Sequence, residues 1–482
     1  MSSPATITTI PLTPNATSNT PLACIGVLTS GGDSQGMNCV LFGLVAAAGR
    51  ETEVYLIRDG YQGLVTGGPG LIEKGRREEL AKYLHQGGTI IGSSRCADFR
   101  TAEGRKRAAR NLLSRNISNL VVVGGDGSLT GANLLRQEWP AIVAEWSKEN
   151  RQQQQGNSNQ LAKLNLVGII GSIDNDFQGT EMTVGADSAL FRIQEAVDVL
   201  RTTAASHGRV MVVEVMGRNC GYLALSSALA TEASYVFLPE CPQEEEEVAG
   251  QNQGQGTGKS WQAKLAARIA FERAHGKFYH LVIVAEGACT VNGVALKATT
   301  IREYLGGEGG LRLDARLCYL GGEQGGGLRL DARLCVLAHT QRGGRTSAFD
   351  RLMSLRMGID AFHCVKGMSS SSPSSSSSNS TLSSAVVLTL NEGNVVAKPL
   401  MNCVQETTKL NGLMREHKWE EVVALRGEHF RLTWNNFRDL MSCNSNDQPG
   451  NNSQQQEQTT WAVAHIGDSV AGVNAVLYGV VR

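Results

Sequence analysis

The chain has 482 residues, enough for about three domains of ordinary size. Hydrophobic residues make up 41% and charged residues 19% of it, which argues against a collagen, a coiled coil or a globally disordered chain. Its 45 basic residues balance 45 acidic ones, so it lacks the basic surplus of a protein that binds nucleic acid or an anionic membrane. We therefore expect a small-molecule ligand, held by a local cluster of charges.

The amino-terminal composition and the cysteine usage both bear on the cellular compartment. The amino-terminal residues are rich in Ser, Thr and Pro without an apolar leader run, and no apolar stretch is long enough to span a membrane. The 11 cysteines are scattered and form no CxxC pair, as is typical of a reduced chain. We expect a cytoplasmic protein that binds neither membranes nor nucleic acid.

Short apolar runs recur along the chain, each followed by a turn and most then by a helical pattern. The runs are residues 25–29, 120–123, 166–171, 210–216 and 281–285. This rhythm predicts an α/β fold with parallel sheet. Because ligands of such sheets bind beyond the carboxyl ends of the strands, we expect the chemistry in the turns after these runs, which contain GGDS, GGDGS, GSIDND, MGRNCG and AEG.

Two of these turns are candidates for phosphate binding. Gly125 and Gly127 follow one apolar run, and glycine lets the backbone approach a ligand while the N–H groups of the next helix attract an anion. Asp126 in the same turn suits Mg²⁺, which prefers oxygen ligands. One such turn alone is weak support, but residues 25–38 offer a second. Neither turn has the GxGxxG spacing of a dinucleotide site.

Acidic and basic side chains cluster in the later turns. Asp174 and Asp176 follow an apolar run, where one carboxylate could accept a hydroxyl proton and the other could contact metal-bound water. An Asx turn at the end of a strand is the alternative interpretation. Guanidinium groups that can grip phosphate also lie at or near turns. They are Arg95, Arg209, Arg218, Arg333 and Arg342, with His339 close by. Together they predict a phosphorylated substrate as well as a nucleotide.

Polar, low-complexity segments interrupt the pattern at about residues 148–160, 244–259 and 369–380, where we expect surface loops. The stretch 254–260 ends in GKS, but GxxxxGK[ST] requires glycine at the position of Gln253, so we expect a linker instead.

Long motifs in a fixed order give the chain a family resemblance. They are LTSGGDSQGMN, GTIIGSSRCADFR, VVVGGDGSLTGA, GSIDNDFQGTEMTVGADSAL, VEVMGRNCGYLAL, AEG and AHTQRGGRTSAFDRLMSLRMG. Over about residues 23–440 the chain resembles the amino-terminal, catalytic half of eukaryotic ATP-dependent 6-phosphofructokinases. The resemblance implies two Rossmann-like, three-layer α/β domains with the active site in the cleft between them. It also implies phosphorylation of fructose 6-phosphate at its C1 hydroxyl to fructose 1,6-bisphosphate, the committed step of glycolysis.

The resemblance also implies a division of the chain into segments. After a disordered tail at 1–21, the catalytic half fills 22–400. Its ATP-binding domain takes about 22–185 and a return after about 300, and its sugar-phosphate domain takes about 186–300 and a carboxyl-terminal return. Residues 401–460, which contain a helical pattern, are expected to link this half to a second one.

Two internal repeats bear on this division. The segment 304–318 recurs directly as 319–335, so one structural unit has been copied in tandem. The segment 36–45 is echoed by 472–481, so a strand, a glycine-rich turn and a helix begin a second time. We therefore expect 461–482 to be a truncated start of a second, homologous half.

Roles can be assigned from the resemblance where positions match. ATP is expected at Gly32, Arg95, Cys96, Gly125, Asp126, Gly127 and Ser128. Asp126 matches the Mg²⁺ ligand, Asp174 the base for the C1 hydroxyl, and Arg218 the arginine that steadies the transferring phosphoryl group. The sugar and its 6-phosphate are expected at Ser172, Ile173, Asp174, Arg209, Met216, Gly217, Arg218, Glu286, Arg333, His339, Thr340, Gln341 and Arg342. Because neighbouring subunits contribute some of these residues in the family, the resemblance implies a homo-oligomer, a tetramer in the family.

Some positions leave alternatives. Gly127 stands where pyrophosphate-using relatives usually carry a second aspartate, so ATP is favoured over pyrophosphate. Arg316 and Arg333 compete for one role because of the tandem copy, and we choose Arg333 for its spacing from His339. Thr340 replaces the usual valine, so its hydroxyl needs a partner if it is buried.

The duplication and the ending support a second hypothesis. The chain could be a catalytically silent fragment that binds nucleotide or sugar phosphate and regulates full-length subunits. The candidate catalytic residues Asp126, Asp174 and Arg218 are nevertheless all in place, which favours an enzyme.

Overall fold

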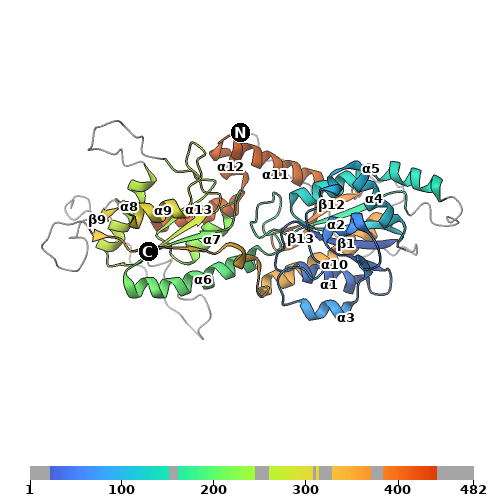
Figure 1. The fold of residues 1–482 in the computed structure, drawn as a ribbon, viewed down its shortest axis with the longest axis horizontal. Coiled ribbons are helices and arrows are strands. Elements are labelled where there is room, and N and C mark those ends of the chain that lie inside the picture. The colour runs from blue at the N-terminus through green and yellow to red at the C-terminus, as the bar shows by residue number, and fades with distance from the viewer. Residues whose placement is uncertain are drawn as a thin grey trace.

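The computed structural model describes residues 22–150, 161–244, 260–307, 311–313, 328–370 and 384–441. They form two lobes, each built on its own main β-sheet (Figure 1). The expected tail at 1–21, most of the three polar inserts, and the expected start of a second half lie outside the described residues.

The first lobe contains a seven-stranded sheet in the order β13-β12-β5-β4-β1-β2-β3. The strands are β1 (Cys24–Ser30), β2 (Val54–Ile57), β3 (Ile72–Lys74), β4 (Ile117–Gly124), β5 (Asn165–Ile170), β12 (Ala385–Asn391) and β13 (Asn394–Pro399). The inner pairs are parallel, and only β3 and β13 at the two edges run antiparallel to their neighbours. Along β4, Leu120 and Val122 enter one core while Val121 and Val123 enter the other, as the alternating faces of a strand require.

Helices cover both faces of this sheet. On one face lie α1 (Met37–Ala48), α3 (Arg77–Leu80) and α10 (Ala348–Ser370). On the other lie α2 (Gly60–Thr66), α4 (Ala102–Leu113), α5 (Asp126–Glu149) and α11 (Leu400–Arg415). The α1–α10 contact is close because Gly43 and Gly358 face it: a Cβ on Gly43 would lie 2.4 Å from the Leu355 oxygen, and one on Gly358 would lie 2.3 Å from the Val40 oxygen.

The second lobe contains a four-stranded parallel sheet in the order β11-β6-β8-β7. Its strands are β6 (Val210–Val215), β7 (Tyr235–Phe237), β8 (His280–Ala285) and β11 (Ala332–Val336). One face carries α6 (Ala186–His207), α7 (Tyr222–Ala230) and α13 (Glu428–Met441), and the other carries α8 (Trp261–Ala274) and α9 (Ala298–Gly306). Each lobe therefore has three layers, which confirms the predicted pair of α/β domains.

The two copies of the tandem repeat form different strands. Its second version supplies β11, which pairs with β6 in the main sheet. Its first version supplies β9 (Arg312–Leu313), which pairs antiparallel with β10 (Leu328–Arg329), and Arg316 lies outside the described residues. β11 belongs to the second sheet, and α10, which follows it in the chain, covers the first sheet.

The segment expected as a linker is packed against both lobes over its described part. α11 covers the first sheet, and α12 (Trp419–Leu425) continues beside it across the top of the molecule towards the second lobe (Figure 1). In α13, Phe430 and Phe437 are each 5% exposed and lie in the core of the second lobe. These helices therefore contribute to the packing of the two lobes.

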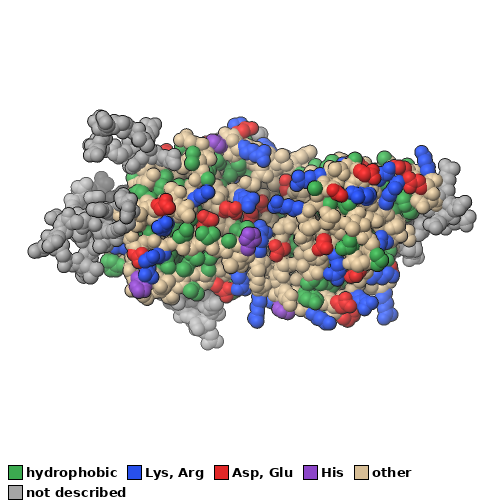
Figure 2. All heavy atoms as spheres, viewed as in Figure 1, with side chains coloured by type: hydrophobic (Ala, Val, Ile, Leu, Met, Phe, Trp, Pro, Cys, Tyr) green, Lys and Arg blue, Asp and Glu red, His purple; other side chains and the backbone are tan. Residues whose placement is uncertain are grey.

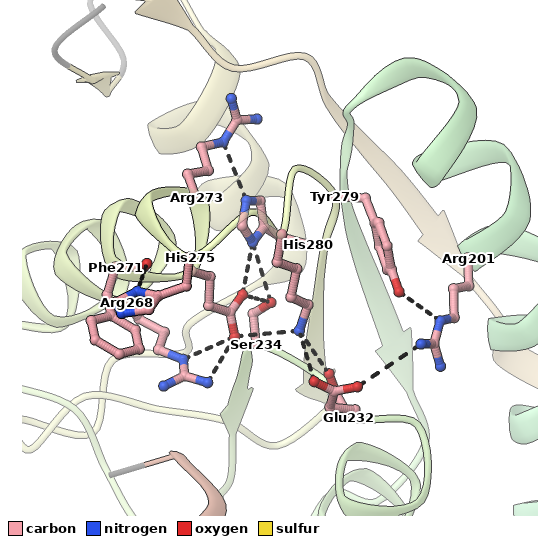
Figure 3. Close-up of polar contacts among 11 residues, drawn as sticks. Arg201, Glu232, Ser234, Arg268, Phe271, Arg273, His275, Tyr279 and His280 are labelled. Atoms are coloured by element: carbon pink, nitrogen blue, oxygen red, sulfur yellow. Dashed lines mark hydrogen bonds and ion pairs between the residues drawn. The ribbon is translucent and has the colours of Figure 1, made fainter. Parts of the chain in front are cut away.

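A buried polar cluster fastens α8 to the second sheet (Figure 3). Glu272 on α8 accepts hydrogen bonds from Ser234 Oγ and from His280 Nδ1, the latter at 2.8 Å, while Arg273 Nε donates to His280 Nε2 at 3.2 Å. Burial alone would raise the pKa of Glu272, but these hydrogen bonds and the charges of Lys277 and Arg268 lower it to about 2. Burial also lowers the pKa of His280, so the cluster holds a carboxylate and a neutral imidazole.

Acidic and basic side chains are interspersed over the visible face of both lobes, as the balanced composition predicts (Figure 2). Within the described ranges, no helix combines the length and the apolar character needed to cross a membrane.

Candidate functional site

A cavity of about 470 Å³ opens where β1 and β4 lie side by side in the first sheet. The chain leaves β1 towards β2 on one side and leaves β4 towards β5 on the other, so this is the point at which the strand order reverses. Ligands of open α/β sheets bind at such a point, beyond the carboxyl ends of the strands. Ser30 and Gly124, paired at those ends, place the two glycine-rich turns next to each other. We call this space the glycine-turn cavity.

All seven residues expected to hold a nucleotide line the glycine-turn cavity. They are Gly32, Arg95, Cys96, Gly125, Asp126, Gly127 and Ser128. Gly125 caps α5, so the first N–H groups of a long helix lie at the cavity, where they favour an anion. Ser128 ties the two turns together: its Oγ lies 3.0 Å from Ser30 Oγ, and its carbonyl accepts a hydrogen bond of 2.6 Å from the Tyr61 hydroxyl.

An aromatic pair that the motifs did not predict also lines this cavity. The rings of Tyr61 and Phe99 stack with centroids 3.9 Å apart and planes inclined by 16°. Phe99 lies inside the motif GTIIGSSRCADFR, which could have drawn attention to it, whereas nothing in the sequence marks Tyr61. The cavity thus combines a polar, glycine-rich side with an apolar, aromatic one.

Three carboxylates, those of Asp126, Asp174 and Asp176, follow the carboxyl ends of β4 and β5, and two of them, Asp126 and Asp176, line the cavity. One oxygen each of Asp126 and Asp174 is buried and has no hydrogen-bond partner among the described residues. Asp176, by contrast, accepts a hydrogen bond of 2.9 Å from Ser172 Oγ. Burial, and then the nearby charge of Asp176, raises the pKa of Asp174 to about 6, and the same two causes raise the pKa of Asp126.

Unpartnered, buried carboxylate oxygens are costly unless a proton, a hydrogen-bond donor or a cation completes them. Asp126 therefore fits a magnesium ion that takes its remaining ligands from phosphate oxygens and water. The described part of the chain contains no group of three or more His, Cys, Asp or Glu side chains suited to holding a metal without such help. A single carboxylate of this kind fits a cation that is bound together with a polyphosphate.

The second lobe contributes the carboxyl ends of β6 and β8. Arg218 Nε donates to Glu286 Oε1 at 2.8 Å, and the Arg218 side chain remains 74% exposed. The N–H of Met216 donates to Gln341 Oε1 at 3.1 Å, which fixes the turn after β6. Gly217 has φ of +120°, and a Cβ there would lie 2.3 Å from the Cys220 oxygen, so this turn requires glycine.

Charges from the two lobes act on each other across this space. The charges of Arg342 and Arg218 partly offset the raised pKa of Asp174, while the charge of Glu286 adds to it. Asp174 thus lies within the electrostatic reach of the residues expected to hold the sugar and the phosphoryl group.

Two further candidate substrate residues are Ile173 and Thr340. The Ile173 side chain is fully buried and packs into the core of the second lobe. Thr340 is exposed, and its hydroxyl donates to the Leu337 carbonyl, so the threonine has the partner that the replacement of valine called for.

Four of the residues expected to bind the sugar phosphate do not come together within one chain: Arg209, Arg333, His339 and Arg342. Arg342 lines the glycine-turn cavity: its Nη1 donates to the Asp33 carbonyl at 3.1 Å, and a Cβ on Gly32 would lie 2.5 Å from it. His339 is exposed on the same short 3₁₀ helix, Ala338–Arg342.

Arg209 and Arg333 instead lie towards the amino ends of the second sheet. Both pair with Asp331, through contacts of 2.7 Å and 2.8 Å. Arg209 precedes β6, whereas Met216 follows it, and a strand of this length spans roughly 20 Å. The two arginines are therefore remote from the site formed by their own chain.

Comparisons with known proteins agree with this geometry. Residues 24–365 match the phosphofructokinase family, described as "Phosphofructokinase". The chain is 42% identical over 464 residues to the platelet-type ATP-dependent 6-phosphofructokinase of Homo sapiens, covering 95% of this chain and 52% of that protein. It is 40% identical over 459 residues to the muscle-type ATP-dependent 6-phosphofructokinase of Canis lupus familiaris, with the same two coverages.

Among solved structures, phosphofructokinase from Saccharomyces cerevisiae superposes with a TM-score of 0.73 at 35% identity, covering 86% of this chain and 50% of that one. The chain thus spans about half the length of the relatives it matches. On the family match, which covers most of its residues, the chain belongs to the phosphofructokinase family.

Proposed function

We propose that this chain transfers the γ-phosphoryl group of ATP to the C1 hydroxyl of fructose 6-phosphate, giving fructose 1,6-bisphosphate. The observation that carries the proposal is the pair of buried carboxylate oxygens of Asp126 and Asp174, which follow the carboxyl ends of β4 and β5 and have no hydrogen-bond partner among the described residues. One carboxylate can serve the cation that accompanies a polyphosphate, and the other can serve a reacting hydroxyl.

Asp174 acts as the base in this proposal. A pKa near 6 leaves the carboxylate mostly ionised at neutral pH yet able to accept a proton from the C1 hydroxyl as the bond to phosphorus forms. The proton moves to an Asp174 oxygen, the hydroxyl oxygen bonds to the γ-phosphorus, and the bond to the leaving ADP breaks in line.

Arg218 and the helix dipole stabilise the charge that develops during transfer. The exposed guanidinium of Arg218, held at one side by Glu286, is free to turn towards a phosphoryl group, and the amino end of α5 faces the phosphates. Asp126 would hold Mg²⁺, which neutralises phosphate charge when bound. The rate enhancement then comes mainly from positioning and electrostatics.

ATP is the proposed donor. Gly127 leaves open space in the turn, since a Cβ built there would meet nothing within 4 Å. The aromatic pair of Tyr61 and Phe99 supports the same choice, because an apolar wall has a use in binding a nucleoside but none in binding pyrophosphate.

The remote position of Arg209 and Arg333 supports a homo-oligomer. Within one chain their guanidinium groups are held by Asp331 at the far end of the second sheet. They can reach a sugar phosphate only if a neighbouring copy presents them to it, so we propose that the sugar-phosphate site is completed between subunits, in an assembly that would be a tetramer if it follows the family. We also propose that the protein works in the cytoplasm.

A coupled assay with fructose 6-phosphate, Mg²⁺ and either ATP or pyrophosphate tests the proposal. We expect turnover with ATP, none with pyrophosphate, and loss of turnover in Asp174→Ala. Folded protein that binds ATP but does not turn over would instead support the silent, regulatory fragment.

A further inference from the structure

A second cavity, of about 310 Å³, lies at the junction of the two lobes and shares no lining residue with the glycine-turn cavity. We call it the junction cavity. Its walls come from the loop 175–181, the β12–β13 hairpin and the turn between α12 and α13. In Figure 1 this is the region where α12 and α11 pass between the lobes.

Arg426 brings a buried cation to this cavity. Its side chain is only 3% exposed; Nε donates to Glu240 Oε1 at 2.9 Å and Nη2 donates to the Asn219 carbonyl. The third nitrogen, Nη1, is buried and has no acceptor among the described residues. A guanidinium normally uses its donors when it is buried, so one binding position for an acceptor is left over.

The carboxylate of Glu240 does not provide an acceptor for Arg426 Nη1. Glu240 is 1% exposed, and both of its oxygens already accept from the Gly221 N–H, at 2.9 and 3.0 Å, in addition to the contact with Arg426. Gly221 is the amino-terminal cap of α7, which adds partial positive charge nearby.

Lys398 brings a second cation to the junction cavity. The residue is 7% exposed, and its Nζ donates to the Gly179 carbonyl at 2.6 Å. Among the described residues it forms no ion pair with a carboxylate: its charge acts on Glu406, but only at longer range. An ammonium group buried without an anion is costly, so the site favours one.

We propose that the junction cavity binds a small oxyanion, a phosphate or carboxylate group, between Lys398 Nζ and Arg426 Nη1. The cavity is at the lower end of the size range of ligand pockets, so the ligand is a small metabolite. Phe177 and Phe430 line it as well, which suits a short carbon skeleton. The exposed carboxylates of Glu181 and Glu428 also belong to the lining and disfavour ligands of high negative charge.

The junction cavity adjoins the loop that carries the proposed base, Asp174. Asn175 lines it and is the neighbour of Asp174, and a ligand there would bridge this loop to the α12–α13 turn. An effect on turnover is therefore expected, and this part of the inference rests on the proposed function. Binding itself does not.

Calorimetric titration of the full chain with inorganic phosphate, and separately with succinate, tests the site. Saturating ADP and fructose 6-phosphate occupy the other proposed phosphate sites without allowing turnover. We expect Lys398→Met to weaken binding of the preferred anion at least tenfold. The matched control is Lys409→Met, an exposed lysine on α11, which should stay within twofold of the unmodified chain. The stronger of the two anions identifies the phosphate or the carboxylate source.

Two results would overturn the inference: neither anion binds the unmodified chain, or Lys398→Met binds as tightly as Lys409→Met. If Lys398→Met fails to fold, Arg426→Lys takes its place, because it keeps a cation beside Glu240 while removing the guanidinium donors. A chain that is inactive in the coupled assay but loses anion binding in these variants would refute the proposed function and leave the junction cavity standing.

Discussion

Buried carboxylates in the first lobe differ from one in the second lobe in whether their oxygens have hydrogen-bond partners. Beyond the carboxyl ends of β4 and β5 in the first lobe, Asp126 and Asp174 keep buried oxygens without partners among the described residues. In the second lobe, the buried carboxylate of Glu272 is held instead by His280 and Ser234. Satisfied polar clusters stabilise a fold, whereas unsatisfied ones are retained where a ligand completes them. The contrast separates structural charge from functional charge within one chain.

The comparison predicts its largest effect at Asp174. Asp174→Asn keeps the shape of the side chain but removes the proton acceptor, so we expect kcat to fall by roughly 10²- to 10⁴-fold, the usual contribution of a general base. The KM for ATP should change little, because Asp174 does not line the glycine-turn cavity. Steady-state kinetics beside a thermal melt would check this. A variant that loses its fold, or keeps its kcat, would contradict the assignment.

The next effect concerns stability in the second lobe. Glu272→Gln leaves the surrounding cations without their anion, so we expect the free energy of unfolding to fall by about 3–5 kcal/mol. Glu303→Gln, at an exposed side chain on α9, is the control and should cost less than about 1 kcal/mol. Denaturant titration measures both. Equal losses in the two variants would remove the distinction between the lobes.

Acid should weaken this cluster in the unmodified chain. The folded pKa values of Glu272 and His280 both lie below their ordinary values of 4.5 and 6.5. The unfolded chain therefore binds more protons, and stability must fall as the pH drops. The His280 contribution is lost first, below about 6.5, and the Glu272 contribution between about 4.5 and 2. In Glu272→Gln the second phase should be missing.

A smaller effect is expected in the pH profile of activity. Asp174 accepts a proton only when it is ionised, so kcat/KM should fall about tenfold per unit below its pKa of about 6 and level off above it. Asp176→Asn removes the neighbouring negative charge and should move this acidic limb to lower pH. An acidic limb that does not move would mean that Asp176 adds nothing to the effect of burial on the pKa of Asp174.

The smallest effect is expected at the surface pair of arginines. Asp331→Asn breaks two exposed ion pairs, so stability should change by less than about 1 kcal/mol. The freed guanidinium groups should bind a neighbour's substrate better, which lowers the KM for fructose 6-phosphate by up to about fivefold. Arg333→Ala should raise that KM. If neither variant changes it, the proposed completion of the site between subunits is wrong.

The sequence predicted the layered fold and the glycine-turn residues because both depend on local patterns. The continuous apolar run Leu120 to Val123 indicates a strand buried on both faces, and the glycines of the turns allow close backbone approach; both are read without reference to the rest of the chain. Asp126 and Asp174 could be found for the same reason, since each lies just beyond the end of a strand.

Long-range packing could not be predicted in this way. The burial of Ile173 depends on where the second lobe docks, and the stacking of Tyr61 on Phe99 joins two segments that are remote in sequence. Residues 401–460 were expected to be a linker because the family resemblance implies one there. Their partner surface on the second lobe, which buries Phe430 and Phe437, is visible only in the structure.

The tandem copy gives this chain a redundant edge strand. The eight residues LRLDARLC occur at 311–318 and again at 328–335, so either version has the side chains needed to pair with β6. The two versions differ in their continuation, because only the second runs within two residues from Val336 into the 3₁₀ helix that carries Gln341. Using the first would require a much longer loop to close over the same gap, at an entropic cost. The choice between two chemically equal strands is thus made by connectivity, and a gene lacking either copy would encode the same sheet.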